Sequence, residues 1–597
     1  MRRIRPTLVA GALALALAAG SASAQFSGVY TFGDSLSDAG QYGARWTTNP
    51  GLTAFMYIGE NFGFSSAPST QGGNNFAYGG ARVSSLPGFP PSPPTAAAVP
   101  VATQVTQFLS QGALDPNALY QIQGGANDVF TLASTPGLTS AQIQAGVVQS
   151  ALDLATQVGR LRAAGAQYVI VQNLPDIGRT PFAASQGAQA TFTGISGLFN
   201  STLDGAIGSA GLSVIQFNTS ALLNEVVASP ALYGFANATT PACTTASAIQ
   251  CTPSTLVVPD ANLTYVFADG VHPTTGAQRL LAQAIVSMIS GPQQMAALAE
   301  APRAVERATW RTLDSRMMSS INAAGVPQKL QAWAAYDYAR DDISGTGLSG
   351  DGNVNTISVG ADLRASDHLL AGLAFGYSEY KGDFGNGNGN FKLREPTITA
   401  YVGYGMGPWY VATTLGLGSL DIDTRRNIVL GAATRTETGT TKGYQNTVRV
   451  LGGYWLRYQN WDHGPFAKLT WDKIIVRQFS ENGNDSTALN FNQQKNEAFI
   501  SSLGWQVAGN ISGWRPFARV TWEYNFNDDN RQVTAKPVGL NGTYVVPGYQ
   551  QDSNWALFDL GISRDFGRVT GFLSGNATTG KDDGDYYSIT LGFRVPL

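Results

Sequence analysis

The chain contains three histidines, and one of them follows an aspartate at a spacing that suits acid–base chemistry. His272 stands in the segment DGVH, three residues after Asp269, whereas His368 and His463 lie in the aromatic-rich second half of the chain. Three residues are enough for a tight turn that brings the carboxylate to one ring N–H, as a catalytic serine, histidine and aspartate require. Asp269 and His272 are therefore candidates for an orienting acid and a general base.

A serine suited to nucleophilic attack lies in the segment GDSLSD. Ser35 directly follows a short β-rich run, residues 29–32, at a turn that contains a glycine. A hydroxyl in this position can project from the carboxyl edge of a parallel sheet, but it needs a base to become a good nucleophile. The base that the chain offers is His272. We expect Asp34 and Asp38 to cap or brace the turn.

Attack on a carbonyl creates an oxyanion that needs hydrogen-bond donors, and two glycine-rich segments can supply them. In residues 75–81, NFAYGGA, a glycine allows close approach of the backbone, so that its N–H can point into the site. In residues 124–128, GGAND, the side-chain amide of Asn127 can donate. Together with the backbone N–H of Ser35, these segments would provide three donors.

In their order along the chain, from residue 33 to residue 272, the four segments resemble the blocks of the GDSL family of serine esterases and lipases, also called SGNH hydrolases. The resemblance spans residues 35 to 272 and implies the roles of individual residues. It makes Ser35 the nucleophile, His272 the base and Asp269 the acid of a catalytic triad. The oxyanion donors that it implies are Ser35, Gly80 or, as the alternative, Gly79, and Asn127. An enzyme of this kind needs no metal and no organic cofactor.

Residues 25–292 show the alternation of strands and helices that is typical of a layered α/β domain. The run 168–171 predicts a buried strand, and residues 141–164 have a helical periodicity that stops at Gly165. The resemblance to SGNH hydrolases implies the same class of fold. We therefore predict three layers around a mainly parallel sheet.

The first 24 residues have the features of a cleavable signal peptide. Three arginines occur within the first five residues, an apolar run follows over residues 8–19, and the small-residue segment ASA ends at Ala24. The apolar run is too short for a membrane anchor, which needs about 20 residues. We predict that residues 1–24 direct export and are then removed.

Export would place Cys243 and Cys251 in an oxidising compartment, where cysteines tend to pair. The two residues lie close together in a stretch rich in Thr, Ala and Ser, and neither has a histidine nearby. We therefore expect a disulfide that closes a small surface loop. The alternative is a reactive thiol.

Composition divides the chain near residue 300. The charged fraction is 13%, against about 25% in an average soluble protein, and most of the charged residues lie after residue 300. Trp46 is the only one of the 11 tryptophans before that point. A pI near 5.7 and the lack of a basic patch argue against a nucleic-acid partner. We expect the two halves to be different domains.

The second half alternates between apolar and small or polar residues with a period of two. Residues 357–363, 369–377, 409–417 and 587–593 each show this pattern. Strands of about ten residues with polar loops between them are typical of an outer-membrane barrel, whose outside meets lipid. A soluble sandwich, with shorter strands, is the alternative. We predict an antiparallel transmembrane β-barrel of about twelve strands over residues 326–597.

A helical pattern over residues 293–320 precedes this barrel, and we place a linker helix over residues 293–325. Pro302 should kink the helix or start it afresh. Three arginines recur every four residues and so share one face: Arg303, Arg307 and Arg311. An exported α/β domain followed by a helix and a barrel resembles an autotransporter esterase. The resemblance implies that the helix threads the pore and that its arginines meet acidic lumen residues; a solvated linker is the alternative.

These predictions describe a carboxylic-ester hydrolase that its own barrel anchors in the outer membrane, with the α/β domain exposed at the cell surface. The expected partners are an acyl-ester or lipid substrate, the lipid of the outer membrane and the barrel-assembly machinery during biogenesis. We expect a monomer. Two alternatives stay open: a surface adhesin or scaffold without catalysis, and a phospholipase or O-acyl esterase on the same fold.

Overall fold

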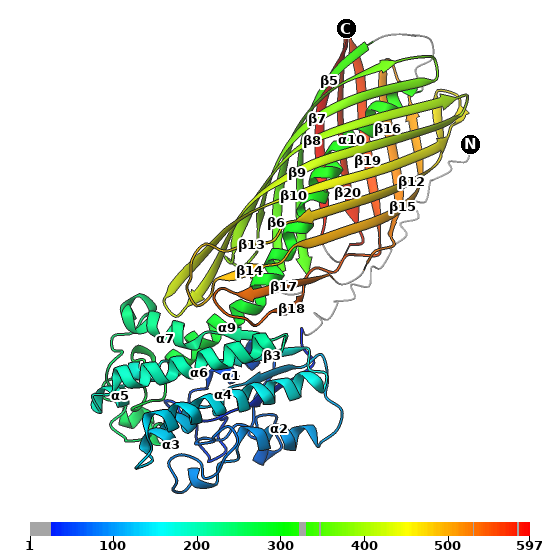
Figure 1. Ribbon diagram of the computed structural model, residues 1–597. Coiled ribbons are helices and arrows are strands. Elements are labelled where there is room, and N and C mark those ends of the chain that lie inside the picture. The colour runs from blue at the N-terminus through cyan, green and yellow to red at the C-terminus, as the bar shows by residue number, and fades with distance from the viewer. Residues whose placement is uncertain (1–24, 322–329, 346–347, 529–530, 582–583) are drawn as a thin grey trace, which may run out of the picture.

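The computed structural model describes residues 25–321, 330–345, 348–528, 531–581 and 584–597 (Figure 1). The predicted signal peptide lies outside the described residues, as does the end of the predicted linker helix. Figure 1 shows an α/β domain at one end of a long β-barrel, with a helical segment that runs from this domain into the barrel. The two halves of the chain are thus different in structure.

A parallel sheet of four strands forms the centre of the α/β domain. In spatial order, the strands are β1 Val29–Phe32, β2 Leu119–Ile122, β3 Tyr168–Gln172 and β4 Ile215–Phe217. Every residue of β2 and β3 is buried, because helices cover both faces of the sheet. The carboxyl ends of all four strands therefore meet at one edge.

Helices on the two faces complete three layers. One face carries α1 Ala54–Asn61, α7 Thr219–Ala228 and α9 Thr275–Met295, and the other carries α2 Val101–Leu109, α4 Ser140–Ala163 and α6 Gln189–Ser209. Three further helices are α3 Ala126–Ser134, α5 Pro181–Ser185 and α8 Ala261–Thr264. On β2, Leu119 packs with the first layer and Tyr120 with the second. The predicted three-layer α/β fold is confirmed.

In the described part of the second half, strands at twelve positions close into an antiparallel barrel. They are, in order, β5 Leu330–Gly345, β6 Leu348–Arg364, β7 Leu369–Asp383, β8 Gly389–Met406, β9 Trp409–Leu430, β10 Ala433–Tyr454, β12 Trp461–Val476, β15 Gln494–Gly509, β16 Trp514–Asn525, β19 Asn554–Phe566, β20 Val569–Thr579 and β21 Tyr586–Pro596. The short strand β11 Leu456–Tyr458 continues from β10 and pairs with β12. Pairing of β21 with β5, and of β10 with β12, closes the barrel, and the predicted number of strands is confirmed.

Side chains of the barrel strands alternate between the outside and the lumen. On β6, Ile357 and Val359 are 61% and 48% exposed, whereas Thr356 and Ser358 are buried. No helix within the described ranges has both the length and the hydropathy to cross a membrane. An apolar exterior around a polar lumen is the arrangement that lipid outside and water inside require. The strands therefore form a lipid-facing surface, as their period of two predicts.

A helix lies inside the barrel and pairs with charges of the lumen (Figure 1). After α9, a short 3-10 turn, η7 Ala296–Ala299, leads into α10 Ala301–Ile321, which begins directly before Pro302. Arg303 bonds to Asp472 of β12 through Nε at 3.2 Å, and Arg311 lies 3.8 Å from Asp337 of β5. The predicted pore-threading helix is confirmed. It starts later than expected, because residues 293–295 are the last turn of α9.

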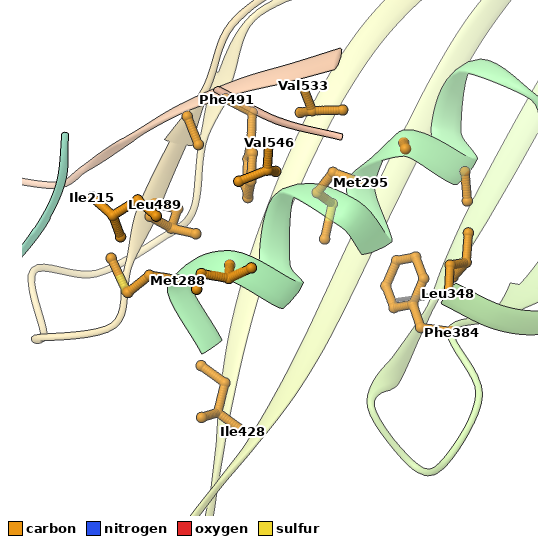
Figure 2. Packing of buried hydrophobic residues seen from close by; sticks show 14 of the residues in the cluster. Ile215, Met288, Met295, Leu348, Phe384, Ile428, Leu489, Phe491, Val533 and Val546 are labelled. Carbon is orange, nitrogen blue, oxygen red and sulfur yellow. The ribbon is translucent and has the colours of Figure 1, made fainter. Parts of the chain in front are cut away.

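Barrel loops and the α/β domain share one hydrophobic core. The loops form a second, small sheet with strands β13 Phe479–Ser480, β14 Leu489–Phe491, β17 Gln532–Pro537 and β18 Tyr544–Pro547. Figure 2 shows these strands against α9, with Met288 and Met295 near Leu489, Phe491 and Val546. All five side chains are buried. The last turns of α9 are thus covered by the barrel's own loops.

Polar contacts continue this joint at its edge. The Val214 N–H, just before β4, donates to the Thr543 carbonyl at 3.0 Å, so that a barrel loop extends the sheet of the α/β domain. Arg435 of β10 bonds to Glu225 of α7 at 2.6 Å. The α/β domain is therefore docked on the barrel by an apolar core with hydrogen bonds around it.

Leu489→Ala is expected to loosen this docking. Leu489 is fully buried in the shared core, where such a truncation costs about 2 to 5 kcal/mol. Because β14 is not part of the closed barrel, the loss falls on the joint, and the backbone amides of α9 should exchange faster with deuterium in detergent solution. The control is Leu503→Ala on the lipid-facing side of β15, where the side chain is 62% exposed. Equal exchange in both variants would contradict the shared core.

Candidate active site

The structure brings Ser35, His272 and Asp269 together in one chain of hydrogen bonds. Ser35 is the third residue after the end of β1, and its Oγ lies 2.9 Å from Nε2 of His272. Nδ1 of the same ring lies 2.8 Å from Oδ2 of Asp269. Ser35 is 8% exposed, and Asp269 is 2% exposed. The three residues that the sequence singles out thus meet at the carboxyl edge of the sheet, in the order hydroxyl, imidazole and carboxylate.

Asp269 is held as an ionised acceptor beside the His272 ring. Its Oδ1 accepts the N–H groups of Val271 at 2.9 Å and of His272 at 2.8 Å, which closes a tight turn. Burial would raise the pKa of the Asp269 carboxyl, but the His272 ring and the hydrogen bonds outweigh burial and lower this pKa to about 2. An ionised carboxylate only accepts, so His272 Nδ1 donates, and Nε2 is left to accept the Ser35 proton.

Hydrogen bonds hold the glycine-rich segments against the Ser35 turn. The Asn75 side chain donates to the carbonyl of Ser37 at 2.8 Å, which fixes residues 75–81 beside the nucleophile turn. The Asn127 side chain donates to the carbonyl of Ala81 at 2.9 Å, which uses one of its two N–H groups. The four segments that the sequence analysis selects therefore form one connected site.

Asp34 and Asp38 brace the nucleophile turn, as expected. Asp34 accepts the side-chain N–H of Gln123 at 2.6 Å, which ties the turn to the end of β2. Asp38 accepts the backbone N–H of Gly40 at 2.7 Å. Both carboxyl groups are fully buried, and burial raises the pKa of each. Their contacts are those of structural acceptors beneath Ser35.

The two adjacent glycines, Gly79 and Gly80, have different surroundings. The Gly79 N–H donates to Oδ2 of Asp38 at 2.8 Å. Gly80 has a φ of +80°, and a Cβ at this position would lie 2.6 Å from the Cβ of Thr95. Over the part of the chain that the structure describes, no protein group accepts the N–H of Gly80 or of Ser35. The Gly80 N–H, and not that of Gly79, is left for a ligand.

Trp46 is a residue of this site that no motif points to. Its ring lies 5.1 Å from the His272 ring at an angle of 38°, and Trp46 is buried. A Cβ on Gly79 would come within 1.9 Å of Trp46 Nε1, so the indole fills the space beside the glycine. The indole thus lies between the His272 ring and the segment 75–81. The one signal in the sequence is that Trp46 is the only tryptophan before residue 300.

Cys243 and Cys251 are joined in a disulfide, and the loop that they close reaches Asp269. The N–H of Ala248, within this loop, donates to Asp269 Oδ2 at 2.6 Å, the oxygen that also bonds to His272. The Cys243 N–H donates to the carbonyl of the residue before Asp269 at 3.1 Å. The loop therefore supports the acid directly, which the spacing of two cysteines does not reveal.

The arrangement as a whole suits acyl transfer. A hydroxyl faces an imidazole nitrogen, a buried carboxylate bonds to the other ring nitrogen, and unengaged N–H groups lie on neighbouring turns. Among the described residues, no three His, Cys, Asp or Glu side chains are grouped so that they could hold a metal ion. The chemistry that these groups offer is nucleophilic catalysis with general acid–base assistance.

Two family descriptions match the two halves of the chain. Residues 29–285 match the GDSL-like Lipase/Acylhydrolase family, and residues 332–576 match the Autotransporter beta-domain. The fold and the site therefore define an autotransporter whose exported domain, or passenger, is of the acylhydrolase class.

Relatives extend over nearly the whole chain. An uncharacterised protein from the trpE-trpG intergenic region of Pseudomonas putida is 30% identical over 92% of this chain and 96% of its own length. Esterase EstA of Pseudomonas aeruginosa is 29% identical over 97% of each chain. The translocator domain of autotransporter NalP from Neisseria meningitidis aligns with 50% of this chain and 98% of its own, at 16% identity and a TM-score of 0.41. The chain belongs to the family of GDSL-like lipases and acylhydrolases joined to an autotransporter β-domain.

This membership confirms two predictions from the sequence. The protein is an ester hydrolase, and it resides in the outer membrane with its passenger exposed at the cell surface.

Trp46→Ala is expected to lower the kcat of ester hydrolysis about tenfold to a hundredfold, because the His272 ring loses the indole that limits its position. Trp46→Phe keeps an aromatic ring and should lose less than tenfold. The measurement is kcat and KM on p-nitrophenyl butyrate. A change in KM with kcat intact would mean that Trp46 contacts the substrate instead of holding the base.

Replacing both Cys243 and Cys251 by serine is expected to lower kcat with little change in KM, since the loop then no longer holds the Ala248 N–H against Asp269. Loss of a disulfide also costs about 2 to 4 kcal/mol of stability, so activity is measured well below the unfolding temperature. The control, Ala248→Gly, keeps both the N–H and the disulfide and should retain the rate. An unchanged kcat in the double variant would show that Asp269 does not need the loop.

Proposed function

We propose that Ser35, His272 and Asp269 are the catalytic triad of this surface ester hydrolase. The observation that carries the proposal is the pair of hydrogen bonds, 2.9 Å and 2.8 Å, that link the three side chains in the order nucleophile, base and acid. No other histidine takes part, because His368 and His463 belong to the barrel half. An adhesin would have no use for such a buried and ordered set of groups.

The proposed reaction has two steps. Ser35 Oγ attacks the acyl carbonyl while His272 Nε2 takes the hydroxyl proton, and the same ring then gives this proton to the departing alcohol. In the second step, His272 takes a proton from water, the water oxygen attacks the acyl-serine, and the proton returns to Ser35 Oγ as the carboxylic acid leaves. Asp269 stabilises the imidazolium in both steps without accepting its proton.

Three donors would hold the negative oxygen of the intermediate. They are the backbone N–H groups of Ser35 and Gly80 and the second side-chain N–H of Asn127. Two contacts favour Gly80 over Gly79: the Gly79 N–H already donates to Asp38, and the indole of Trp46 covers that glycine. Each such donor typically contributes about a hundredfold to a thousandfold to kcat.

The proposed substrates are carboxylic esters. Lipids and O-acylated sugars are included, because they contain the same ester bond. The triad recognises the ester bond itself. The surfaces around Ser35 therefore determine the selectivity for the acyl and alcohol portions. The observed groups suffice for this reaction without a metal or an organic cofactor.

The proposed division of the chain follows its composition and the limits of the two family matches. The proposed units are the signal peptide 1–24, the passenger 25–292, the linker segment 293–325, which contains α10, and the barrel 326–597. One chain closes the barrel by itself, which favours a monomer that the barrel-assembly machinery inserts. The α9 helix crosses the boundary at residue 292, so the passenger and the linker are joined without a flexible break.

Ser35→Ala is expected to reduce the kcat for p-nitrophenyl butyrate on intact cells by at least about ten-thousandfold, since the acyl group then has no nucleophile. The variant should also lose labelling by a fluorophosphonate probe while its amount in the outer membrane stays the same. Ser110→Ala, at an exposed serine after α2, is the matched control and should keep both properties. Labelling that persists without Ser35 would refute the assignment of the nucleophile.

A further inference from the structure

A row of phenylalanine rings lies beside the candidate active site. The rings of Phe89 and Phe130 stack at a centroid distance of 5.6 Å and an angle of 25°, and Phe130 meets Phe182 edge to face at 5.5 Å. Phe192 lies against both Phe130 and Phe182, at 6.2 and 5.6 Å, and is buried. The first three rings are only partly buried. The row therefore has a buried support and a face that solvent reaches.

Each of the three partly exposed rings is attached to a different segment of the site. The Phe89 N–H donates to the carbonyl of Gly80 at 2.9 Å. Phe130 comes three residues after Asn127 on α3, so the two side chains are neighbours on one face of that helix. The Phe182 N–H donates to the carbonyl of Gly270, in the turn between Asp269 and His272, at 2.9 Å. The row thus runs from the oxyanion donors to the turn of the base.

This position makes an open aromatic surface unusual, because the groups around it are polar. The oxyanion donors and the triad engage the ester carbonyl and the alcohol oxygen, and none of them requires an apolar neighbour that solvent can reach. Partly exposed rings that pack on each other offer a low-entropy apolar surface to a ligand. The fourth ring, Phe192, fixes the row from behind, so that its open face needs no rearrangement to bind.

We infer that Phe89, Phe130 and Phe182 bind the aliphatic acyl chain of the ester. The inference rests on the proposed function, since it places the acyl carbonyl between Ser35 and the oxyanion donors. Two of the three rings are attached to donor segments, Phe89 next to Gly80 and Phe130 next to Asn127, which puts the row on the acyl side of the ester. The enzyme is then selective for acyl groups long enough to cover more than one ring.

A chain-length series tests this inference. On p-nitrophenyl esters from acetate to decanoate, kcat/KM should rise about twofold to fourfold for each methylene that covers the rings. Phe130→Ala should lower kcat/KM for decanoate about tenfold and for acetate less than twofold. Phe130→Leu, which keeps an apolar side chain, should fall between the two, and Phe182→Ala should repeat the pattern at the far end of the row.

The matched control is Leu86→Ala, an apolar side chain that is 62% exposed and precedes the Phe89 turn. It should leave the whole series unchanged. A second series varies the alcohol at constant acetate, with ethyl, hexyl and decyl acetate. Dependence on alcohol length that Phe130→Ala abolishes would overturn the inference, because the row would then bind the leaving group.

Fluorophosphonate labelling separates the possible failures. Active sites are counted by the label in each variant, and kcat is calculated per labelled serine, so that misfolded protein does not lower the apparent rate. If the unmodified protein showed neither labelling nor hydrolysis, the proposed function itself would be refuted. Normal labelling, with an acyl-length profile that neither Phe130→Ala nor Phe182→Ala alters, would refute only the role of the aromatic row.

Discussion

The hydrogen bond between Ser35 Oγ and His272 Nε2 joins residues 237 positions apart, and much of the passenger serves to hold its two ends. Ser35 is fixed by the carboxyl end of β1, whose neighbour β2 is followed by Gln123 beneath the nucleophile turn. Two hydrogen bonds from the segment after Trp46 hold the turn of His272. Thr47 donates to the Pro273 carbonyl at 2.9 Å, and Thr48 accepts the Thr275 N–H at 3.0 Å. A misplacement of a catalytic group by about 1 Å can lower the rate a hundredfold, so the contacts that hold Ser35 and His272 matter for chemistry as well as for folding.

Helix α9 connects this geometry to the membrane anchor. The helix begins three residues after His272, where the Thr274 side chain caps it by accepting the Ala277 N–H at 3.3 Å. Its other end carries Met288 and Met295 into the core that barrel loops complete (Figure 2). A single rigid element therefore positions the base at one end and is held by the barrel at the other. This explains why the passenger core and the loop sheet are continuous.

The parts that the sequence predicts are those with a local or periodic pattern. Ser35, Asp269 and His272 stand in short motifs, and the barrel strands repeat every two residues, so both can be recognised without knowing which segments meet. Trp46, the Phe89 row and the bond from Ala248 to Asp269 depend on contacts between distant segments, and residue type alone gives no sign of them. The start of the linker helix, expected at residue 293, also depends on such contacts, because residues 293–295 belong to α9. Helix α9 continues through Gly291 and Pro292, and the missing side chain of Gly291 leaves room for Leu489 and Arg426 at close range.

Charges inside the barrel set the register of α10 and, through it, the position of the passenger. Arg303 pairs with Asp472 on β12, and about three turns further along the helix Asp314 pairs with Arg449 on β10 at 2.7 Å. A shift by one turn, about 5.4 Å, would separate both pairs at once and leave buried charges without partners, at a cost of several kcal/mol for each. These ion pairs stabilise the native register only a little, whereas their loss strongly destabilises every competing register. Only the short turn η7 separates α9 from α10, so the two helices cannot shift independently. The register that the lumen charges select is therefore also the one in which α9 contacts the small sheet of β13, β14, β17 and β18.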